Sequence, residues 1–531
     1  MSSIDKTPTP AAPAVAAAMA ARIRVAIIGL SPSAKGSWAE ESHLAYLLSP
    51  LGRSHYDVVA LLNSTVEDGA ATVERFGFDA ATVKTYADPA ALAADPNVDL
   101  VVCCTTARAH AAAVGPSLRA GKAAYVEWPV AGSLAAALEL ADDVECGRNA
   151  LPPVGAGIES PSSTTDGYHH YHSGASSNSS NDGNGPDRHH HLHLLPAQAR
   201  GGKRLGAESS MIGLQGRLSP VVLKISDLLD SGRVGRVLSS DVRAFGSMGA
   251  RDSVPRSLAH SADRADGRSP ITEVMAHVLD YVHEVLGEFE RGTVRCRMQL
   301  QRSTMRLLGK AGDGGEGVSA EMESDVPDLV VLHGQLAAGR QQQSGGWCSS
   351  PDGRGGGSVV VEDGATLSIM YRSGPPFKGE PAFVWTINCE RGEILVTSPQ
   401  GPYLHSDSYA AAGLDAPDEQ GRRWLRPETI TIRVHDHVRD EVVNVHWDWE
   451  DWQRQLPVRA RIVARLYERF WRRWTQCLKE GEAAGQGGGG GGRGIMFEDD
   501  DWPRIEDGVR RMRQLDELFR QYDKARTQLA S

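Results

Sequence analysis

Short β-rich segments alternate with helical segments up to about residue 145, and this alternation constrains the fold more than any other feature. Apolar runs typical of buried strands occupy residues 23–29, 57–62, 99–104 and 123–126. Helical patterns follow them at residues 38–48, 66–76, 109–120 and 133–144. Strands and helices that alternate at this spacing form βαβ units, in which a parallel sheet carries helices on both faces. The pattern therefore predicts a doubly wound α/β domain.

The pattern changes after residue 234, where apolar residues recur at every second position and helices no longer separate the runs. We expect strands at residues 237–245, 293–301, 328–335, 359–371, 383–389, 393–396 and 429–434. Helical patterns lie at residues 269–286, 458–478 and 503–523. Successive strands without crossover helices favour antiparallel pairing. Residues 235–531 are therefore expected to form an α+β domain with a large, mostly antiparallel open sheet.

Low-complexity segments interrupt the two predicted domains. Residues 1–21 are rich in Ala and Pro and lack the basic start of a signal peptide, so we expect a disordered tail. Residues 147–206 consist largely of Ser, Asn, Gly, Pro and His, which predicts a disordered insertion within a first domain that spans 22–234. The seven histidines of this insertion show no fixed geometry, so no metal site is expected. Glycine-rich inserts at 309–317, 339–357 and 485–494 are expected to lengthen loops.

Charge, hydropathy and cysteine usage exclude several classes of protein. The net charge of −11 opposes direct binding to nucleic-acid phosphates. No run approaches the roughly 18 apolar residues that a membrane span requires. The seven cysteines are scattered and contain no C-x-x-C pair, which argues against a disulfide framework or a structural zinc site. A reducing compartment fits best, and we expect a cytoplasmic or nuclear protein, or one present in both.

The turn after the first predicted strand has features of a dinucleotide site. Backbone N–H groups and a helix N-terminus can face a pyrophosphate at such a turn. The middle glycine of the usual G-x-G-x-x-G pattern is missing, so an ordinary strand-to-helix turn is the alternative. The candidate cofactor-binding residues in this turn are Gly29, Leu30, Ser31 and Gly36.

The end of the second predicted strand bears on the choice between NAD and NADP. An acidic residue commonly holds the NAD ribose at this position. Here Asn63 and Ser64 offer neutral hydrogen-bonding groups instead, and they do not repel a 2′-phosphate. No neighbouring arginine decides the preference, so the cofactor is expected to be NAD or NADP.

Several further motifs, in a fixed order along the chain, resemble one enzyme family. They are the Thr105-Thr106 strand end, His110, Glu127-Trp128-Pro129, residues 215–220, residues 231–235, the pair His277 and Asp280, and residues 506–508. Together they resemble the glucose–fructose oxidoreductase/inositol dehydrogenase family (Gfo/Idh/MocA) over nearly the whole chain. The resemblance implies a Rossmann-type NAD(P)-binding domain whose cofactor cleft also includes Thr105, Thr106, His110, Glu127 and Trp128.

Trp128 replaces the residue that the family usually has in the middle of this three-residue motif. The family's usual sequence there is Glu-Lys-Pro, and its lysine lies near the nicotinamide and the substrate hydroxyl, where an ammonium steers a proton. An indole has a single N–H donor and exchanges no proton at neutral pH. Glu273, His277 and Asp280 lie one helical turn apart and are the candidate catalytic residues if the chain is an enzyme. A histidine that serves only in packing is the alternative.

A narrower resemblance links the chain to the fungal galactose-regulon repressor branch of the family. It rests on residues 29–36, 126–128, 214–217 and 276–277. That branch binds a dinucleotide and a transcriptional activator without acting as a dehydrogenase. The resemblance implies a catalytically degenerate, dinucleotide-sensing regulator with an activator or another protein as partner, in a homo-oligomer. An active NAD(P)-dependent oxidoreductase on a sugar, polyol or related carbonyl compound is the alternative.

Overall fold

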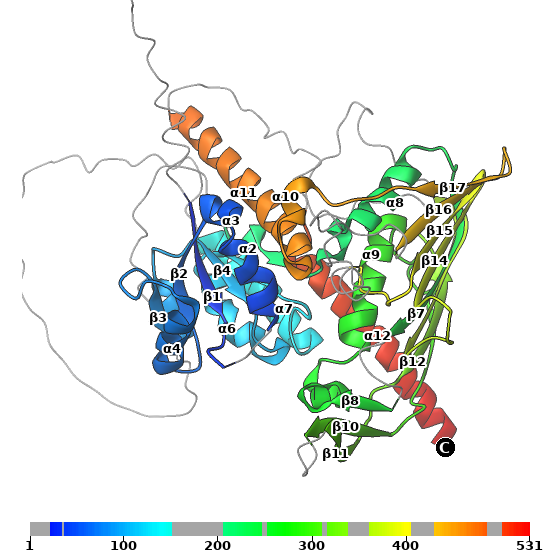
Figure 1. Cartoon of the computed structure of the whole chain (residues 1–531), viewed down its shortest axis with the longest axis horizontal. Helices are drawn as coiled ribbons and strands as arrows, with labels where there is room; N and C mark the ends of the chain where they lie inside the picture. Colours follow the sequence, from blue (N-terminus) through cyan, green and yellow to red (C-terminus); the bar gives the residue numbers. More distant parts are fainter. Residues whose placement is uncertain are drawn as a thin grey trace, which may run out of the picture.

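The computed structural model describes residues 22–33, 37–150, 205–246, 252–310, 316–337, 361–404, 430–485 and 502–530. These residues form an N-terminal domain around a parallel sheet and a C-terminal domain around a large mixed sheet (Figure 1). The predicted fold class is confirmed. The predicted tail at 1–21 lies outside the described residues, as does most of the predicted insertion.

The N-terminal domain contains a six-stranded sheet in the order β3-β2-β1-β4-β5-β6, and every pair is parallel. Helices cover both faces, so the central strands are buried on both sides and read as continuous apolar runs. The strand order reverses between β1 and β4, and ligands bind outside the carboxyl ends of strands at such a point. The strands are β1 Ile23–Ile28, β2 Tyr56–Leu62, β3 Lys84–Tyr86, β4 Leu100–Cys103, β5 Ala123–Val126 and β6 Met211–Ile212.

Local signals in the sequence set the helix ends of this domain. In α4 (Val66–Phe76) the Thr65 side chain accepts a hydrogen bond from the Asp68 N–H, and Gly77 ends the helix in the left-handed conformation. Both signals can be read from the sequence, and α4 has the predicted bounds. The other helical segments are η1 Ala39–Leu44, α2 Ala45–Leu47, α3 Pro50–His55, α5 Pro89–Ala94, α6 Ala107–Arg119, α7 Leu134–Ala150, η2 Ala207–Ser209 and η3 Gln215–Leu218.

The predicted insertion at 147–206 is shorter at its first end than expected. Helix α7 continues to Ala150, so residues 147–150 are helical. Gly147 packs closely there, since a Cβ at this position would meet the Leu118 carbonyl oxygen at 1.9 Å. The chain is described again from residue 205, just before η2. The histidine tract of the insertion lies outside the described residues.

The C-terminal domain contains an eight-stranded sheet in the order β17-β16-β15-β14-β7-β13-β12-β9. Only the central pair β7 and β13 is parallel, so the sheet is mostly antiparallel, as predicted. Helices α8 (Pro220–Asp230) and α9 (Ala276–Leu286) lie on one side of it (Figure 1). The strands are β7 Val237–Gly246, β9 Arg295–Gln299, β12 Leu329–Gln335, β13 Val361–Ser373, β14 Phe383–Cys389, β15 Gly392–Ser398, β16 Thr431–Asp436 and β17 Glu441–Val445.

A second, three-stranded sheet lies beside the large one. It joins β8 (Ser253–Pro255), β10 (Thr304–Lys310) and β11 (Glu316–Glu323) in the order β11-β10-β8. Its hairpin includes residues from the glycine-rich segment that the sequence indicated only as a loop extension. Three short helical segments connect this sheet to α9, namely η4 Arg256–Ala262, η5 Arg264–Asp266 and η6 Ile271–Met275.

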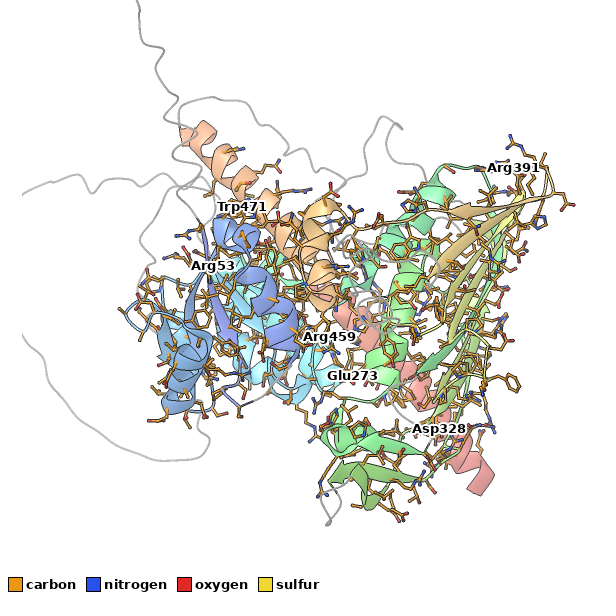
Figure 2. The ribbon with its side chains drawn as sticks, in the orientation of Figure 1. Arg53, Glu273, Asp328, Arg391, Arg459 and Trp471 are labelled. Carbon is orange, nitrogen blue, oxygen red and sulfur yellow. The ribbon has the colours of Figure 1, made fainter. Side chains whose placement is uncertain are left out.

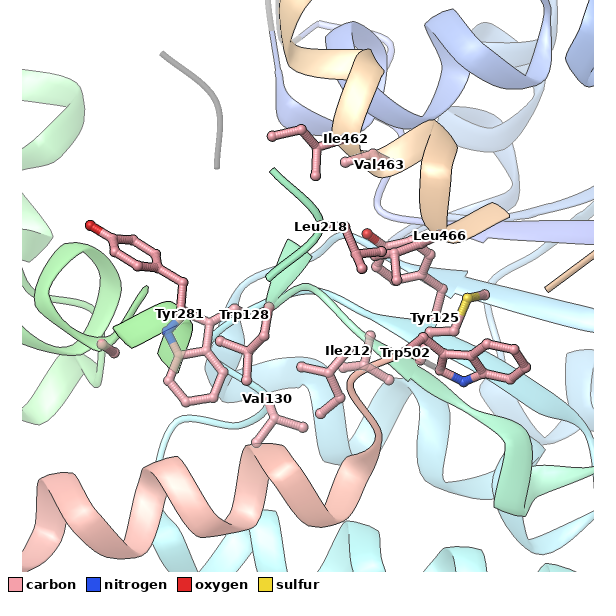
Figure 3. Packing of buried hydrophobic residues seen from close by; sticks show 14 of the residues in the cluster. Tyr125, Trp128, Val130, Ile212, Leu218, Tyr281, Ile462, Val463, Leu466 and Trp502 are labelled. Carbon is pink, nitrogen blue, oxygen red and sulfur yellow. The ribbon is translucent and has the colours of Figure 1, made fainter. Parts of the chain in front are cut away.

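Three helices end the chain and tie the two domains together. They are α10 Asp451–Arg454, α11 Val458–Gly485 and α12 Ile505–Ala530. Helix α11 packs against η1 and α2 of the N-terminal domain, whereas α12 contacts both α7 and β9. The buried apolar residues form one cluster through both domains, and Figure 3 shows part of it, with Leu466 of α11 near Tyr125 and Leu218. No helix in the described ranges is long and apolar enough to cross a membrane.

Candidate functional site

A pocket of about 390 Å³ lies between the two domains, at the carboxyl ends of β4 and β5. Figure 2 shows Glu273 and Arg459, which both line it, in the region between the domains. The pocket brings together residues from distant parts of the sequence. The predicted site residues that line it are Thr105, His110, Glu127, Trp128, Glu273 and His277.

The remaining predicted cofactor residues lie outside the lining of this pocket. Gly29, Leu30 and Ser31 follow β1, and Asn63 and Ser64 follow β2, so they lie at the carboxyl edge of the parallel sheet. Ser64 is exposed and Leu30 is buried. The other two predicted residues are Thr106, which is exposed at the start of α6, and Gly36, which lies outside the described residues.

Gly29 lies where the end of β1 comes close to the end of β4. Its φ is +91°, and a Cβ there would meet the Thr105 backbone nitrogen at 2.9 Å. Only glycine combines this conformation with this spacing. The adjacent Asn63 donates a hydrogen bond from Nδ2 to the Leu30 carbonyl oxygen (2.7 Å). Among the described residues, the buried Asn63 Oδ1 has no hydrogen-bond partner, and this free acceptor fits a donor such as a ribose hydroxyl.

The loop after β1 is also held by a residue that the sequence analysis did not single out. Arg75 of α4 donates from Nη1 to the Ser31 carbonyl oxygen (2.9 Å) and from Nη2 to Glu40 (2.9 Å). The guanidinium therefore fixes the backbone of the turn that faces the dinucleotide position in this fold.

Trp128 is fixed at the junction of the two domains. Its indole N–H donates to the Thr272 carbonyl oxygen at 2.7 Å, and only 9% of the residue is exposed. The bond joins the end of β5 to η6 in the C-terminal domain. The single donor of the indole is therefore already engaged, and its ring closes one side of the pocket.

Glu127 belongs to a buried polar chain that the sequence analysis missed. Its Oε1 lies 2.7 Å from His43 Nε2, and His43 Nδ1 lies 2.8 Å from the Tyr467 hydroxyl of α11. Burial alone would raise the pKa of Glu127, but the hydrogen bond from His43 and the attraction to it lower that pKa overall. The carboxylate is therefore charged next to the indole of Trp128.

His110 connects two strand ends and does not point freely into the pocket. Its Nε2 lies 3.1 Å from the Thr105 carbonyl oxygen, and its Nδ1 lies 3.3 Å from the Val130 carbonyl oxygen. Burial lowers the pKa of His110, so the neutral ring is favoured. This arrangement fits a residue that shapes the cleft.

The C-terminal domain contributes Glu273 and His277, one helical turn apart, to the opposite wall. Burial raises the pKa of the Glu273 carboxyl to about 7, although nearby Arg268 opposes the rise. Two arginines also line the pocket, and both form ion pairs: Arg268 with Asp266 (3.0 Å) and Arg459 with Glu41 (2.7 Å). A carboxyl group that titrates near neutrality can donate or accept a proton at the pH of the cell.

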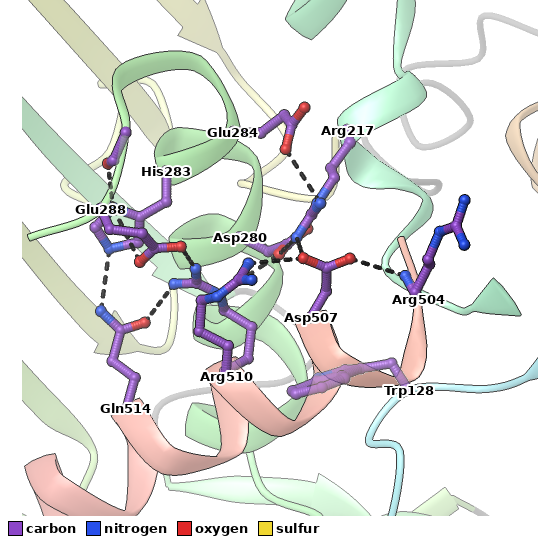
Figure 4. Close-up of polar contacts among 12 residues, drawn as sticks. Trp128, Arg217, Asp280, His283, Glu284, Glu288, Arg504, Asp507, Arg510 and Gln514 are labelled. Carbon is purple, nitrogen blue, oxygen red and sulfur yellow. Dashed lines mark hydrogen bonds and ion pairs between the residues drawn. The ribbon is translucent and has the colours of Figure 1, made fainter. Parts of the chain in front are cut away.

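Asp280, in contrast, lies outside the residues that line the pocket. Its two carboxylate oxygens accept hydrogen bonds from Arg217 at 2.7 and 2.8 Å, and Arg511 Nε lies at 3.5 Å. Figure 4 shows this network, in which Arg217 also approaches Glu284 and Asp507. Asp280 is 1% exposed and joins η3, α9 and α12. Its position therefore fits a structural role in the C-terminal domain.

No group of three or more His, Cys, Asp or Glu side chains in the described ranges is arranged to hold a metal ion. The titratable and charged groups that line the pocket include the carboxyl groups of Glu127 and Glu273, the imidazoles of His110 and His277, and two arginines. Beside it, Gly29 lets the ends of β1 and β4 lie close together, and Asn63 provides a free acceptor that fits a ribose hydroxyl.

Two family models match separate parts of the chain. Residues 23–148 match the oxidoreductase family with an NAD-binding Rossmann fold, and residues 220–347 match the C-terminal domain of Gal80p. Dehydrogenase aclE of Aspergillus oryzae is 24% identical over 381 residues, which are 72% of this chain and 78% of that protein. The galactose/lactose metabolism regulatory protein GAL80 of Saccharomyces cerevisiae is 21% identical over 341 residues, 63% of this chain and 62% of that protein.

Solved structures share the fold at low sequence identity. A super-repressor mutant of Gal80p from Saccharomyces cerevisiae superposes with a TM-score of 0.62 at 15% identity, covering 95% of this chain and 97% of that chain. Levoglucosan dehydrogenase in complex with NADH and levoglucosan gives 0.54 at 15% identity, covering 95% and 98%. The chain therefore matches the Gfo/Idh/MocA oxidoreductase family in its NAD-binding segment and resembles the Gal80 branch in its C-terminal domain.

Proposed function

We propose that the protein binds NAD or NADP in the interdomain cleft and acts as a catalytically degenerate regulator whose protein partner responds to the bound dinucleotide. The observation that carries this proposal is Trp128, which stands where the family's enzymes have a lysine. Its only N–H already donates to the Thr272 carbonyl oxygen. An indole held in this way can stack on a flat ring but supplies no proton for hydride transfer.

The neighbouring residues support dinucleotide binding. In the proposal, Gly29 lets the ends of β1 and β4 lie close together beside the pyrophosphate, and the free Asn63 Oδ1 accepts from a ribose hydroxyl. Trp128 and Thr105 contact the nicotinamide end. When bound, the dinucleotide offers a hydride donor or acceptor, and the chain's own residues determine whether a proton can accompany it. The Glu127 carboxylate, held by His43, fixes the strand end that carries Trp128.

Calorimetric titration with NAD, NADH, NADP and NADPH tests the first part of the proposal. We expect micromolar binding of at least one of them, and a loss of that binding in Gly29→Val, because the added side chain would separate the ends of β1 and β4. Gly232→Val is the matched control, since this glycine has open space around its Cβ position and a similarly positive φ. No binding of any dinucleotide to the folded protein would refute the proposal.

The regulatory part requires a partner whose affinity changes with the dinucleotide. Chemical cross-linking in the native cell, followed by purification of the cross-linked protein, identifies the partner. Its dissociation constant is then measured with and without the dinucleotide that binds. Equal affinities in both conditions would contradict a dinucleotide-sensing role.

An active oxidoreductase is the second candidate, and Glu273 and His277 favour it. Both line the same pocket as Trp128, and the Glu273 carboxyl has a pKa of about 7, which suits general acid–base catalysis. If the protein turns over a carbonyl or hydroxyl compound, Glu273→Gln should lower kcat by about 10²- to 10⁴-fold. Turnover that survives both Glu273→Gln and His277→Ala would assign the chemistry to other residues.

A further inference from the structure

A second, smaller cavity lies next to the interdomain pocket and shares a wall with it. The cavity measures about 100 Å³ and lies between the three-stranded sheet and the end of the large sheet. Glu273, Val274 and Tyr403 line both spaces. A ligand that fills the interdomain pocket therefore lies against residues that also line the cavity.

The lining of the second cavity is mostly apolar. Val254, Leu258, Ala262, Met305 and Val326 contribute aliphatic surface from η4, from two strands of the small sheet and from the segment before β12. These residues offer dispersion contacts and no hydrogen bonds. The space therefore fits an apolar group better than a polar one.

Three of the polar side chains on the wall already have hydrogen-bond partners. Arg302 Nη1 donates to Asp328 Oδ2 at 3.3 Å, and the Ser261 hydroxyl donates to the Leu258 carbonyl oxygen at 2.6 Å. A hydroxylated group placed here would lose its hydrogen bonds to water and gain few in return. Free sugars and polyols, which carry a hydroxyl on nearly every carbon, are therefore poor occupants.

The volume sets the size of the occupant. One water needs about 10–15 Å³ on this measure, and an apolar cavity of about 150 Å³ in another protein stays dry and binds benzene. A space of about 100 Å³ is thus comparable to a single six-membered ring or a branched aliphatic group. The apolar lining offers water few hydrogen-bond partners, so an apolar group that displaces water from the cavity binds favourably.

We propose that the second cavity holds an apolar group, of about the size of a phenyl ring, that belongs to the ligand whose polar end lies between Trp128 and His277. Glu273 and Tyr403 lie at the boundary, where this ligand passes from its polar to its apolar part. The ligand class is a hydroxy or carbonyl compound with an aromatic or branched aliphatic substituent. The inference rests on the proposed dinucleotide cleft for the polar end, and it holds whether the ligand is converted or only sensed.

Paired probes test the apolar part directly. The dissociation constants of 4-phenylbutan-2-one, butan-2-one and glucose are measured by calorimetry with NADH present and with NADH absent. Burial of a phenyl ring should make the phenyl ketone bind at least about tenfold more tightly than butan-2-one. Equal affinities of the two ketones, or no binding of the phenyl ketone at millimolar concentration, would overturn the inference.

Two substitutions test whether the phenyl ring binds in the second cavity. Ala262→Leu fills the cavity and should weaken binding of 4-phenylbutan-2-one about tenfold while leaving butan-2-one unchanged. Ala71→Leu, at an exposed position of α4, is the matched control and should change neither affinity. Unchanged binding of the phenyl ketone in a folded Ala262→Leu protein would refute the assignment.

If Ala262→Leu does not fold, a variant with an enlarged cavity tests the same inference. Leu258→Ala removes part of the wall and should shift the preference from the phenyl ketone to its larger naphthyl analogue. An unshifted preference would contradict the inference. Failure of the dinucleotide to bind is a separate result, because the ratio of the two ketone affinities without NADH reports on the phenyl ring independently of the dinucleotide.

Discussion

Replacing Glu273 by glutamine should make the stability of the protein less dependent on pH. Burial raises the pKa of this carboxyl from 4.5 to about 7. The folded protein then favours the neutral acid, so this group's contribution to stability is present below pH 4.5 and is lost as the pH rises through 7. At about 1.4 kcal/mol per pKa unit, the full loss amounts to about 3.5 kcal/mol, most of which falls between about pH 5 and about pH 8. Glutamine stays neutral at every pH and has nearly the same size, so it removes this loss.

Urea unfolding of the wild type and of Glu273→Gln at about pH 5 and about pH 8 measures the effect. The two proteins should have similar free energies of unfolding at the lower pH. At the higher pH the glutamine variant should be more stable by about 2–3 kcal/mol. Glu139→Gln, at an exposed position of α7, is the control and should follow the wild type. If Glu273→Gln also follows the wild type at both pH values, the carboxyl is not held neutral by burial.

Three further substitutions test the packing around the cleft. Gly29→Ala should lower the free energy of unfolding by more than Gly77→Ala does. Both glycines have a positive φ, but only at Gly29 would the added Cβ meet backbone atoms. Equal losses of stability in urea would contradict this steric argument. His43→Ala should cost about 2–3 kcal/mol because it leaves the Glu127 carboxylate without its donor. Since the pKa of Glu127 is lowered, that loss should shrink as the pH falls below 4.5, and a pH-independent loss would refute this explanation. Asp280→Ala should cost about 3 kcal/mol, measured by thermal or urea unfolding, because it removes the carboxylate that two buried guanidinium groups share. A nearly neutral Asp280→Ala would show that the network adds little stability.

The sequence predicted the longer elements of the fold because each carries its own periodic pattern. Helix α4 is an example, with a capping threonine at one end and a glycine at the other. Strand β3 and helix α5 were missed because they are only three and six residues long, too short for a period to show. The hairpin of β10 and β11 was missed because its glycine-rich turn region resembles a loop.

The candidate site could be predicted only where a family motif or a helical period marks it. Trp128 was singled out by a family motif, and Glu273 and His277 by their helical spacing; the structure places all three in the lining of one pocket. His43 was missed because it lies 84 residues from Glu127, and no local pattern links residues so far apart. Asp280 follows His277 by three residues on a helix of 3.6 residues per turn, so its side chain is rotated by about 60° and meets Arg217 instead of the pocket.

The contact between His43 and Tyr467 has a consequence for synthesis of the chain. The two residues are 424 positions apart, so the N-terminal domain is synthesised long before the residue of α11 that it contacts. The Tyr56 hydroxyl likewise donates to the Tyr467 carbonyl oxygen, which emerges equally late. Until α11 appears, the apolar face that it covers is available to chaperones or to other unfinished chains. A nonsense mutation before the codons for α11 would therefore damage the N-terminal domain as well as the C-terminal helices.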